Sequence, residues 1–119
     1  MAKILVVDDS RIIRRVLTTT LVEAGYEIAG EASNGEEALK LLEEVTPDLV
    51  TLDITMPIMD GLETLTHIKM KYPDLGVVMI SAAGQKNKVM TALKSGALDF
   101  IRKPFEKDDM LGVIAKYIK

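Results

Sequence analysis

The feature that most constrains the fold of this chain is a regular alternation of short apolar runs with amphipathic helical patterns. Five apolar runs recur along the chain, at residues 4–7, 28–32, 49–52, 77–80 and 100–101. The first, third and fourth runs have almost no polar alternation, which is typical of strands covered on both faces of a parallel sheet. Strands that alternate with helices predict right-handed crossovers. The pattern therefore predicts an α/β fold, a doubly wound (βα)5 domain with a five-stranded parallel sheet.

The spacing of apolar residues predicts five helices, after residue 10, from about residue 34, at about 62–71 and 86–94, and after residue 104. The sequence Ser-Asn-Gly-Glu at 33–36 has the pattern of a capping box that opens the second helix at Ser33. Val16 of the first helix and Met90 of the fourth are among the residues expected to face the core. Gly61 is expected to supply a turn conformation.

Composition and length restrict the class of protein further. The chain contains no cysteine, which excludes a disulfide framework and a cysteine metal site. No apolar run approaches the roughly 20 residues of a membrane helix, and no secretory cleavage site follows the first residues. We therefore expect a cytoplasmic protein without membrane insertion. The length fits one domain, residues 1–119, and we expect no effector domain.

Charge is unevenly divided along the chain. Residues 1–85 carry 7 Lys and Arg against 14 Asp and Glu, whereas residues 86–119 carry 8 against 4. Chance differences between solvated helix faces explain such a division, and so does an acidic site in the first part with a basic contact surface in the last. The chain has neither the strongly basic footprint of a nucleic-acid-binding protein nor a glycine-rich phosphate loop, so neither nucleic acid nor nucleotide is an expected partner.

Polar side chains follow four of the five predicted strands. Asp8 and Asp9 follow the first run, Asp53 the third, Ser81 the fourth and Lys103 the fifth. In a doubly wound sheet the functional groove lies at the carboxyl ends of the strands. If the first and third strands are neighbours, three carboxylates converge there. Their pKa values would rise unless a positive group, either Lys103 or a divalent cation, joins them.

This set of residues indicates phosphoryl chemistry. Carboxylate oxygens favour Mg²⁺ or a similar hard cation over zinc. A carboxylate beside Mg²⁺, a lysine and a hydroxyl can attack phosphorus, because the metal and the lysine offset the charge of the transferred phosphoryl group. A purely structural role as helix caps would suffice for Asp8 or Asp9 alone, but it accounts poorly for five such residues on four strand ends.

The motifs together resemble the receiver domain of two-component response regulators, most closely the stand-alone CheY-like type. The resemblance spans the whole chain and rests on five short motifs, at 6–10 (Val-Val-Asp-Asp-Ser), 52–57 (Leu-Asp-Ile-Thr-Met-Pro), 59–61 (Met-Asp-Gly), 81–82 (Ser-Ala) and 103–105 (Lys-Pro-Phe). Each motif is weak alone, but their order and spacing together are specific. The resemblance implies the CheY- and flavodoxin-like strand order 2-1-3-4-5.

The resemblance also implies a phosphorylation site and a metal site. It implies that Asp53 accepts the phosphoryl group. It implies that Asp9 and Asp53 bind Mg²⁺ directly, that Asp8 binds it mainly through water, and that the backbone carbonyl of Thr55 completes the protein ligands. The peptide bond before Pro104 is expected to be cis, as family members use this bond to aim the lysine.

Further roles carried over from the family concern the phosphoryl group and the switch. Ser81 stands where the family has a hydroxyl that turns toward the phosphoryl oxygen, and Lys103 pairs with that oxygen. The backbone of Thr55 and of Ala82 is expected to contact the phosphoryl group. Phe100 stands where many members have the switch tyrosine.

The implied function is a signalling switch rather than an enzyme, with self-phosphorylation and slow self-dephosphorylation as its only chemistry. A histidine kinase would load Asp53, and the phosphorylated form would bind a downstream protein, in chemotaxis or a phosphorelay, through the fourth helix, fifth strand and fifth helix. Thr55 and Ala83, which flank the path of the hydrolytic water in the family, offer only a hydroxyl and a methyl group. An external phosphatase is therefore a further expected partner. His67, the only histidine, is expected on the surface.

Three alternatives remain. The chain is a receiver domain cut from a larger response regulator, a small aspartate-nucleophile phosphatase of the haloacid dehalogenase kind, or a pseudo-receiver that never takes phosphate. The phosphatase class is expected to carry Asp-x-Asp after its first strand, whereas this chain has Asp-Asp-Ser at 8–10. The intact set of acids, hydroxyl and lysine argues against the pseudo-receiver.

Overall fold

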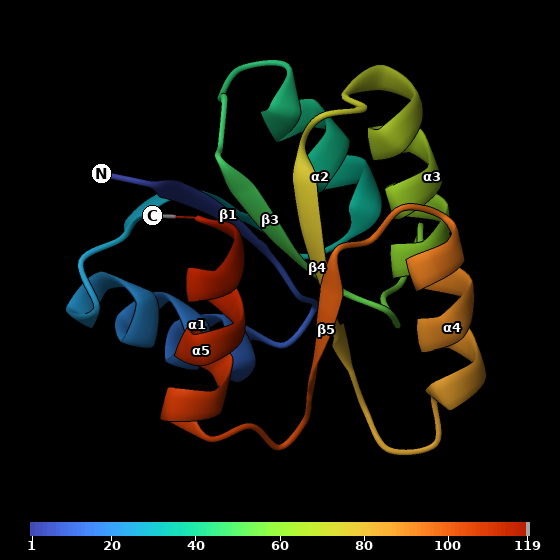
Figure 1. Cartoon of the computed structure of the whole chain (residues 1–119). Coiled ribbons are helices and arrows are strands. Elements are labelled where there is room, and N and C mark those ends of the chain that lie inside the picture. The colour runs from blue at the N-terminus through green and yellow to red at the C-terminus, as the bar shows by residue number, and fades with distance from the viewer. Residues whose placement is uncertain (119) are drawn as a thin grey trace.

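The five apolar runs form five parallel strands in the computed structural model, which describes residues 1–118 (Figure 1). The strands are β1 (Lys3–Val7), β2 (Glu27–Ala32), β3 (Leu49–Asp53), β4 (Gly76–Ser81) and β5 (Asp99–Arg102). Their order in the sheet is β2-β1-β3-β4-β5. The predicted fold class and strand order are confirmed. This order places β1 beside β3, with Val7 opposite Leu52.

In the described part of the chain, five helices connect and follow the strands, and they form two layers (Figure 1). They are α1 (Arg11–Glu23), α2 (Gly35–Leu42), α3 (Gly61–Lys71), α4 (Lys86–Lys94) and α5 (Lys107–Tyr117). Helices α1 and α5 cover one face of the sheet, and α2, α3 and α4 cover the other. Within residues 1–118, every helix falls short of the length and apolar character needed to span a bilayer.

The strand period of two divides the core between these layers. Ile4 and Val6 point toward the α1 and α5 layer, where they pack with Leu17 of α1 and Met110 of α5. Their neighbours in β1 point to the opposite face and join the cluster under α2, α3 and α4. All five residues of β3 are buried, as expected for a central strand covered on both sides.

Three helix starts are capped at the same edge of the sheet. Ser10 Oγ accepts from the backbone N–H of Ile13 at 3.2 Å, and Asp60 Oδ1 accepts from that of Glu63 at 2.9 Å. The capping box predicted at 33–36 is wrong by one residue. Asn34 is the N-cap of α2, and its Oδ1 accepts from the backbone N–H three residues later at 2.9 Å. Asparagine is at least as favourable as serine at an N-cap, so Asn34 can cap the helix in place of Ser33.

Two residues predicted to face the core are exposed. Val16 of α1 is 44% exposed and Met90 of α4 is 50% exposed. The buried positions are Leu17 and Leu21 in α1, and Val89 and Ala92 in α4, so each helix presents a narrower apolar stripe than the sequence suggested. Short helices that pack on one sheet face need only such a stripe.

Gly61 serves close approach rather than a turn conformation, which corrects the prediction. It is the first residue of α3, and its N–H donates to the carbonyl of Ile54 at 2.7 Å. A Cβ at this position would collide with the carbonyl oxygen of Asp53 and lie 2.7 Å from Cα of Ile54. The left-handed turn conformation falls on Ile58, with φ of 70°. The glycine thus lets α3 begin directly against the end of β3.

Candidate functional site

Three carboxylates meet at the carboxyl edge of the sheet. Asp8 and Asp9 directly follow β1, and Asp53 is the last residue of the neighbouring strand β3. Each residue offers a carboxylate oxygen that lies within 4.8 Å of the other two. Asp8 is fully buried and Asp53 is 5% exposed, whereas Asp9 is exposed to solvent. The predicted convergence of the acids is therefore confirmed as a matter of geometry.

Lys103, which directly follows the edge strand β5, brings a positive charge to this cluster. Its Nζ lies 3.1 Å from Oδ2 of Asp8 and 3.5 Å from Oδ2 of Asp53. The backbone N–H of Lys103 donates to the carbonyl of Ser81 at 2.7 Å, which fixes the start of the loop after β5. The bond to Pro104 is cis, as the resemblance implies.

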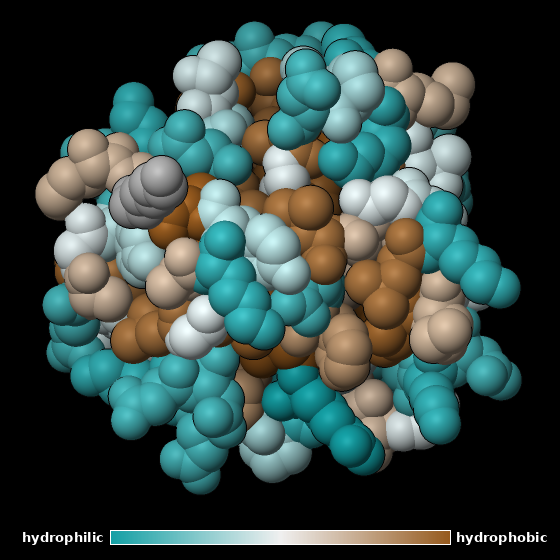
Figure 2. Space-filling model, viewed as in Figure 1, coloured by the Kyte–Doolittle hydropathy of each residue, from teal (hydrophilic) through white to brown (hydrophobic). Residues whose placement is uncertain are grey.

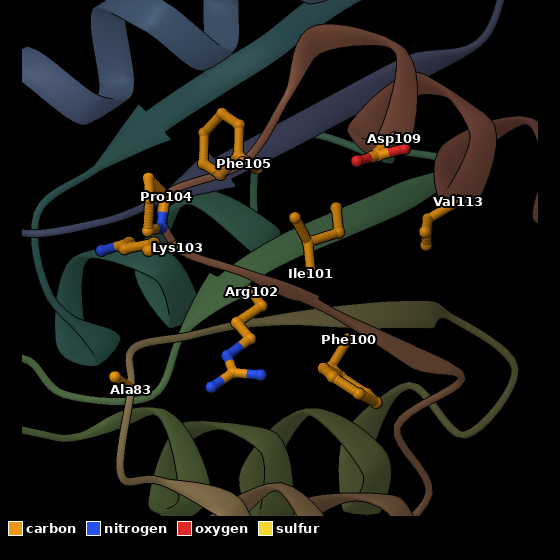
Figure 3. Close-up of a pocket in the computed structure, with 9 residues that line it drawn as sticks. All are labelled: Ala83, Phe100, Ile101, Arg102, Lys103, Pro104, Phe105, Asp109 and Val113. Atoms are coloured by element: carbon orange, nitrogen blue, oxygen red, sulfur yellow. The ribbon is translucent and has the colours of Figure 1, made fainter.

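Alternation along β5 sends its side chains to opposite sides (Figure 3). Phe100 and Arg102 project to one side, and Ile101 projects to the other, toward Phe105 and the α5 residues. The lysine extends away from all of these side chains. The hollow drawn in Figure 3 is lined by β5, the segment that follows it and α5, with Ala83 from the loop after β4. Among its lining residues within 1–118, Lys103 is the one that also contacts the acids.

Burial and charge perturb the acceptor candidate. Burial raises the pKa of Asp53 from 3.8 to about 6, with the charge of Asp8 adding to the rise, Lys103 opposing it and Asp9 adding a smaller rise. The positive charge of Lys103 is thus insufficient to offset the effects of burial and of the neighbouring carboxylates on the pKa of Asp53. A group that adds positive charge at this edge would stabilise the ionised form of the cluster.

The cluster fits a hard divalent cation. Oδ1 of Asp8 accepts from the backbone N–H of Ser10 at 2.8 Å, but within residues 1–118 the buried Oδ2 has no hydrogen-bond partner of good geometry. Its close partner is the ammonium of Lys103, which forms an ion pair with it at 3.1 Å. A buried carboxylate oxygen that accepts no hydrogen bond, beside two further carboxylates, is a suitable donor set for Mg²⁺, which binds oxygen ligands and keeps several waters.

Ser81 and Ala82 lie at the same edge, one strand further along. Ser81 ends β4, is 3% exposed, and sits one residue beyond Ile80, which pairs with Asp53. Ala82 follows it in an exposed loop, and Thr55 lies exposed two residues beyond Asp53. A cavity between β4, α4 and β5 is lined by Ser81, Ala82, Gln85, Val89, Phe100 and Arg102. The predicted switch residues Ser81 and Phe100 thus share one hollow.

Two residues near the site were missed by the sequence analysis. The Nη1 of Arg14 in α1 donates to the backbone carbonyl of Asp8 at 2.6 Å and steadies the end of β1. Gln85 Oε1 accepts from the N–H of Ala82 at 2.7 Å, and its Nε2 donates to Thr55 Oγ1 at 2.6 Å. The sequence signal that could have indicated Gln85 was its amide side chain directly before the predicted fourth helix.

His67 lies apart from this chemistry. It is exposed on α3, with Nε2 at 3.8 Å from Oε2 of Glu63 one turn earlier. The expected surface position is confirmed.

Fold and site together define a class: a flavodoxin-like α/β domain with a candidate cation site and a lysine at the carboxyl edge of its sheet. The chain belongs to the response regulator receiver domain family, whose model matches residues 4–115. CheY-like receiver domains are signalling switches rather than conventional enzymes, so the class of function is that of a two-component signalling domain.

Relatives of two kinds match the chain. It is 48% identical to the chemotaxis protein CheY of Listeria monocytogenes over 119 residues, which cover all of both chains, and 45% identical to that of Bacillus subtilis over 114 residues, which cover 96% of this chain and 95% of the relative. The solved receiver domain of NtrX from Brucella abortus superposes with a TM-score of 0.92 at 38% identity and covers 97% of each chain. Against a longer NtrX chain the TM-score is 0.94 at 39% identity, and the match covers 99% of this chain but only 27% of NtrX.

Proposed function

We propose that this chain is a phosphorylation-dependent switch in which Asp53 accepts the phosphoryl group. One observation carries the proposal: a nearly buried carboxylate stands among two others, with a lysine Nζ at 3.5 Å. With a pKa of about 6, Asp53 is mostly ionised at neutral pH and is more basic than an ordinary carboxylate. Both properties favour attack on phosphorus.

The transfer is a single displacement. One Oδ of Asp53 forms a bond to phosphorus, and the bond from phosphorus to the donor atom breaks, with its electron pair leaving on the donor. When the donor is the phosphohistidine of a histidine kinase, the leaving atom is an imidazole nitrogen. Lys103, the hydroxyl of Ser81 and the N–H of Ala82 then offset the charge on the phosphoryl oxygens.

The metal site of the proposal uses the same edge. Asp8, Asp9 and Asp53 would hold Mg²⁺, with the backbone carbonyl of Thr55 as a further ligand. When bound, Mg²⁺ supplies positive charge that offsets the carboxylates and the transferred phosphoryl oxygens. This role agrees with the raised pKa of Asp53 and with the buried Asp8 oxygen that, within residues 1–118, accepts no hydrogen bond.

The proposed output surface consists of α4, β5 and α5. Large apolar side chains are exposed along it, namely Met90, Leu98, Phe100 and Tyr117. Figure 2 shows hydrophobic residues, in brown, gathered on this face among hydrophilic ones, in teal. The surface lysines Lys86, Lys88 and Lys94 of α4 add positive charge. A downstream protein with an apolar contact and acidic residues would complement this surface.

The remaining proposed partners are a histidine kinase as phosphodonor and an external phosphatase, with the cytoplasm as the place of action.

Phosphorylation by a small donor tests this function. Acetyl phosphate with Mg²⁺ should add one labile phosphoryl group per chain, as measured by intact mass spectrometry. EDTA and Asp53→Asn should each abolish the addition, whereas Asp74→Asn, which removes an exposed charge from the loop after α3, should not. Equal labelling of Asp53→Asn would overturn the assignment. Rapid turnover of a generic phosphate ester would favour a phosphatase instead.

A further inference from the structure

The side chain of Gln85 joins the two loops that the proposed function assigns to the phosphoryl group. Its Oε1 accepts from the backbone N–H of Ala82 at 2.7 Å, and its Nε2 donates to the hydroxyl of Thr55 at 2.6 Å. Thr55 follows β3 and Ala82 follows β4, so the amide bridges the ends of neighbouring strands. Both bonds are short for their type, and together they fix the orientation of the carboxamide.

This arrangement is not explained by the position of Gln85 in its helix. Gln85 is the N-cap residue of α4, yet within residues 1–118 its side chain makes no capping bond to the helix. An N-cap side chain ordinarily accepts from the first-turn N–H groups. Here the carboxamide is directed toward the phosphorylation site instead, although the residues around it, 82–84 and 86–88, are exposed.

The hydrogen bond from the Ala82 N–H to Gln85 Oε1 affects how a phosphoryl group on Asp53 can bind. A backbone N–H has one proton to donate, and Gln85 Oε1 already accepts it. A phosphoryl oxygen on Asp53 that uses the same N–H must displace the carboxamide. The neutral amide oxygen is the weaker acceptor of the two, because hydrogen bonds to charged oxygens are roughly twice as strong.

Building on the proposed function, we propose that Gln85 is a positioning residue whose carboxamide holds the place of a phosphoryl oxygen, so that phosphorylation exchanges one acceptor on the Ala82 N–H for another. The resting state is thereby stabilised and loading is restrained. The exchange also releases the side chain of Gln85 at the start of α4. The backbone of Gln85 stays tied to the helix, because its carbonyl accepts from the N–H of Val89 at 2.9 Å. Gln85, Val89 and Phe100 line one cavity, so the release occurs beside the proposed switch aromatic.

Amide hydrogen exchange tests the geometric premise without any metal or phosphoryl group. In EDTA, the Ala82 N–H of the wild type should be protected, and Gln85→Ala should accelerate its exchange at least several-fold. Gln85→Glu should retain protection, because a carboxylate still accepts from this N–H. Asn87→Ala removes a nearby exposed amide in the first turn of α4 and should leave exchange at Ala82 unchanged.

Binding of beryllofluoride, a phosphoryl mimic, tests the exchange of acceptors. In Mg²⁺, Gln85→Ala should bind it roughly three- to tenfold more tightly than the wild type, the gain expected from removing one competing hydrogen bond. Gln85→Glu should bind it more weakly, because its charge repels the anion. Mg²⁺ affinity of Gln85→Ala without beryllofluoride should match the wild type, since Gln85 is not among the carboxylates of the metal site. Opposite effects of the two substitutions distinguish acceptor exchange from a merely structural role, which would move both in the same direction.

The outcomes separate this inference from the function on which it rests. A wild type that binds no beryllofluoride and is not phosphorylated overturns both. If the wild type is phosphorylated, two results overturn only the role of Gln85. One is an unchanged beryllofluoride affinity of Gln85→Ala, and the other is an unprotected Ala82 N–H in the wild type.

Discussion

Replacing Asp53, the proposed acceptor, should stabilise the metal-free protein, and the gain should depend on pH. Burial raises the pKa of Asp53 from 3.8 to about 6, a rise of about two units. At about 1.36 kcal/mol per unit, the ionised carboxylate costs up to about 3 kcal/mol of folding free energy. Solvent screening at the open edge of the sheet reduces the expected cost to about 1–2 kcal/mol. Asp53→Asn keeps the shape and removes the charge.

The sign follows from proton uptake. Because the folded-state pKa of Asp53 lies above its unfolded value, folding takes up a proton between about pH 4 and pH 6. Stability therefore falls as pH rises through that window, and the full cost is present above pH 6. Asp53→Asn should exceed the wild type by about 1–2 kcal/mol at pH 7.5 and by much less near pH 4.5.

Urea unfolding in EDTA measures this difference. At pH 7.5 the midpoint of Asp53→Asn should exceed that of the wild type by roughly 0.5–1 M, with an unchanged slope. Asp74→Asn controls for the loss of one negative charge from an exposed loop and should shift the midpoint little. Mg²⁺ should stabilise the wild type more than Asp53→Asn, because a ligand that binds only the folded state adds to stability. An Asp53→Asn variant that is equally stabilised at both pH values, or destabilised at pH 7.5, would refute the reasoning.

Three further predictions concern packing, lifetime and output. Gly61→Ala should destabilise the protein by about 2–4 kcal/mol in urea unfolding, because the added Cβ meets backbone atoms, whereas Gly112→Ala in open space should be neutral or slightly stabilising. The pair Thr55→Asn with Ala83→Glu should speed decay of the acyl phosphate in a radiolabel chase, since it adds polar groups that can orient a water, and an unchanged half-life would contradict that reasoning. Lys88→Glu should leave phosphorylation intact and weaken capture of an acidic partner by the phosphorylated form, with the wild-type affinity falling as salt rises.

The sequence was sufficient to predict the strands and helices and the edge of the sheet at which the candidate site lies. Apolar runs without polar alternation predicted β1, β3 and β4, and α4 has the predicted range of 86–94, followed after its C-cap by Gly96 in a left-handed conformation of φ 109°. Strand order came from the family resemblance rather than from periodicity. The errors at Val16 and Met90 arose because spacing shows which residues share a helix face but not how wide a stripe the sheet will cover.

What the sequence by itself determined is therefore local: strand, helix and cap signals, and the acids, hydroxyl and lysine that follow the strands. Tertiary structure alone decided that Asp8 is buried and its neighbour Asp9 exposed, and that Lys103 spans from β5 to the acids of β1 and β3. It alone placed Gln85 across the two loops. The physical reason is that periodicity and capping depend on residues a few positions apart, whereas burial, charge pairing and hydrogen bonds between loops depend on which strands become neighbours when the sheet closes its core.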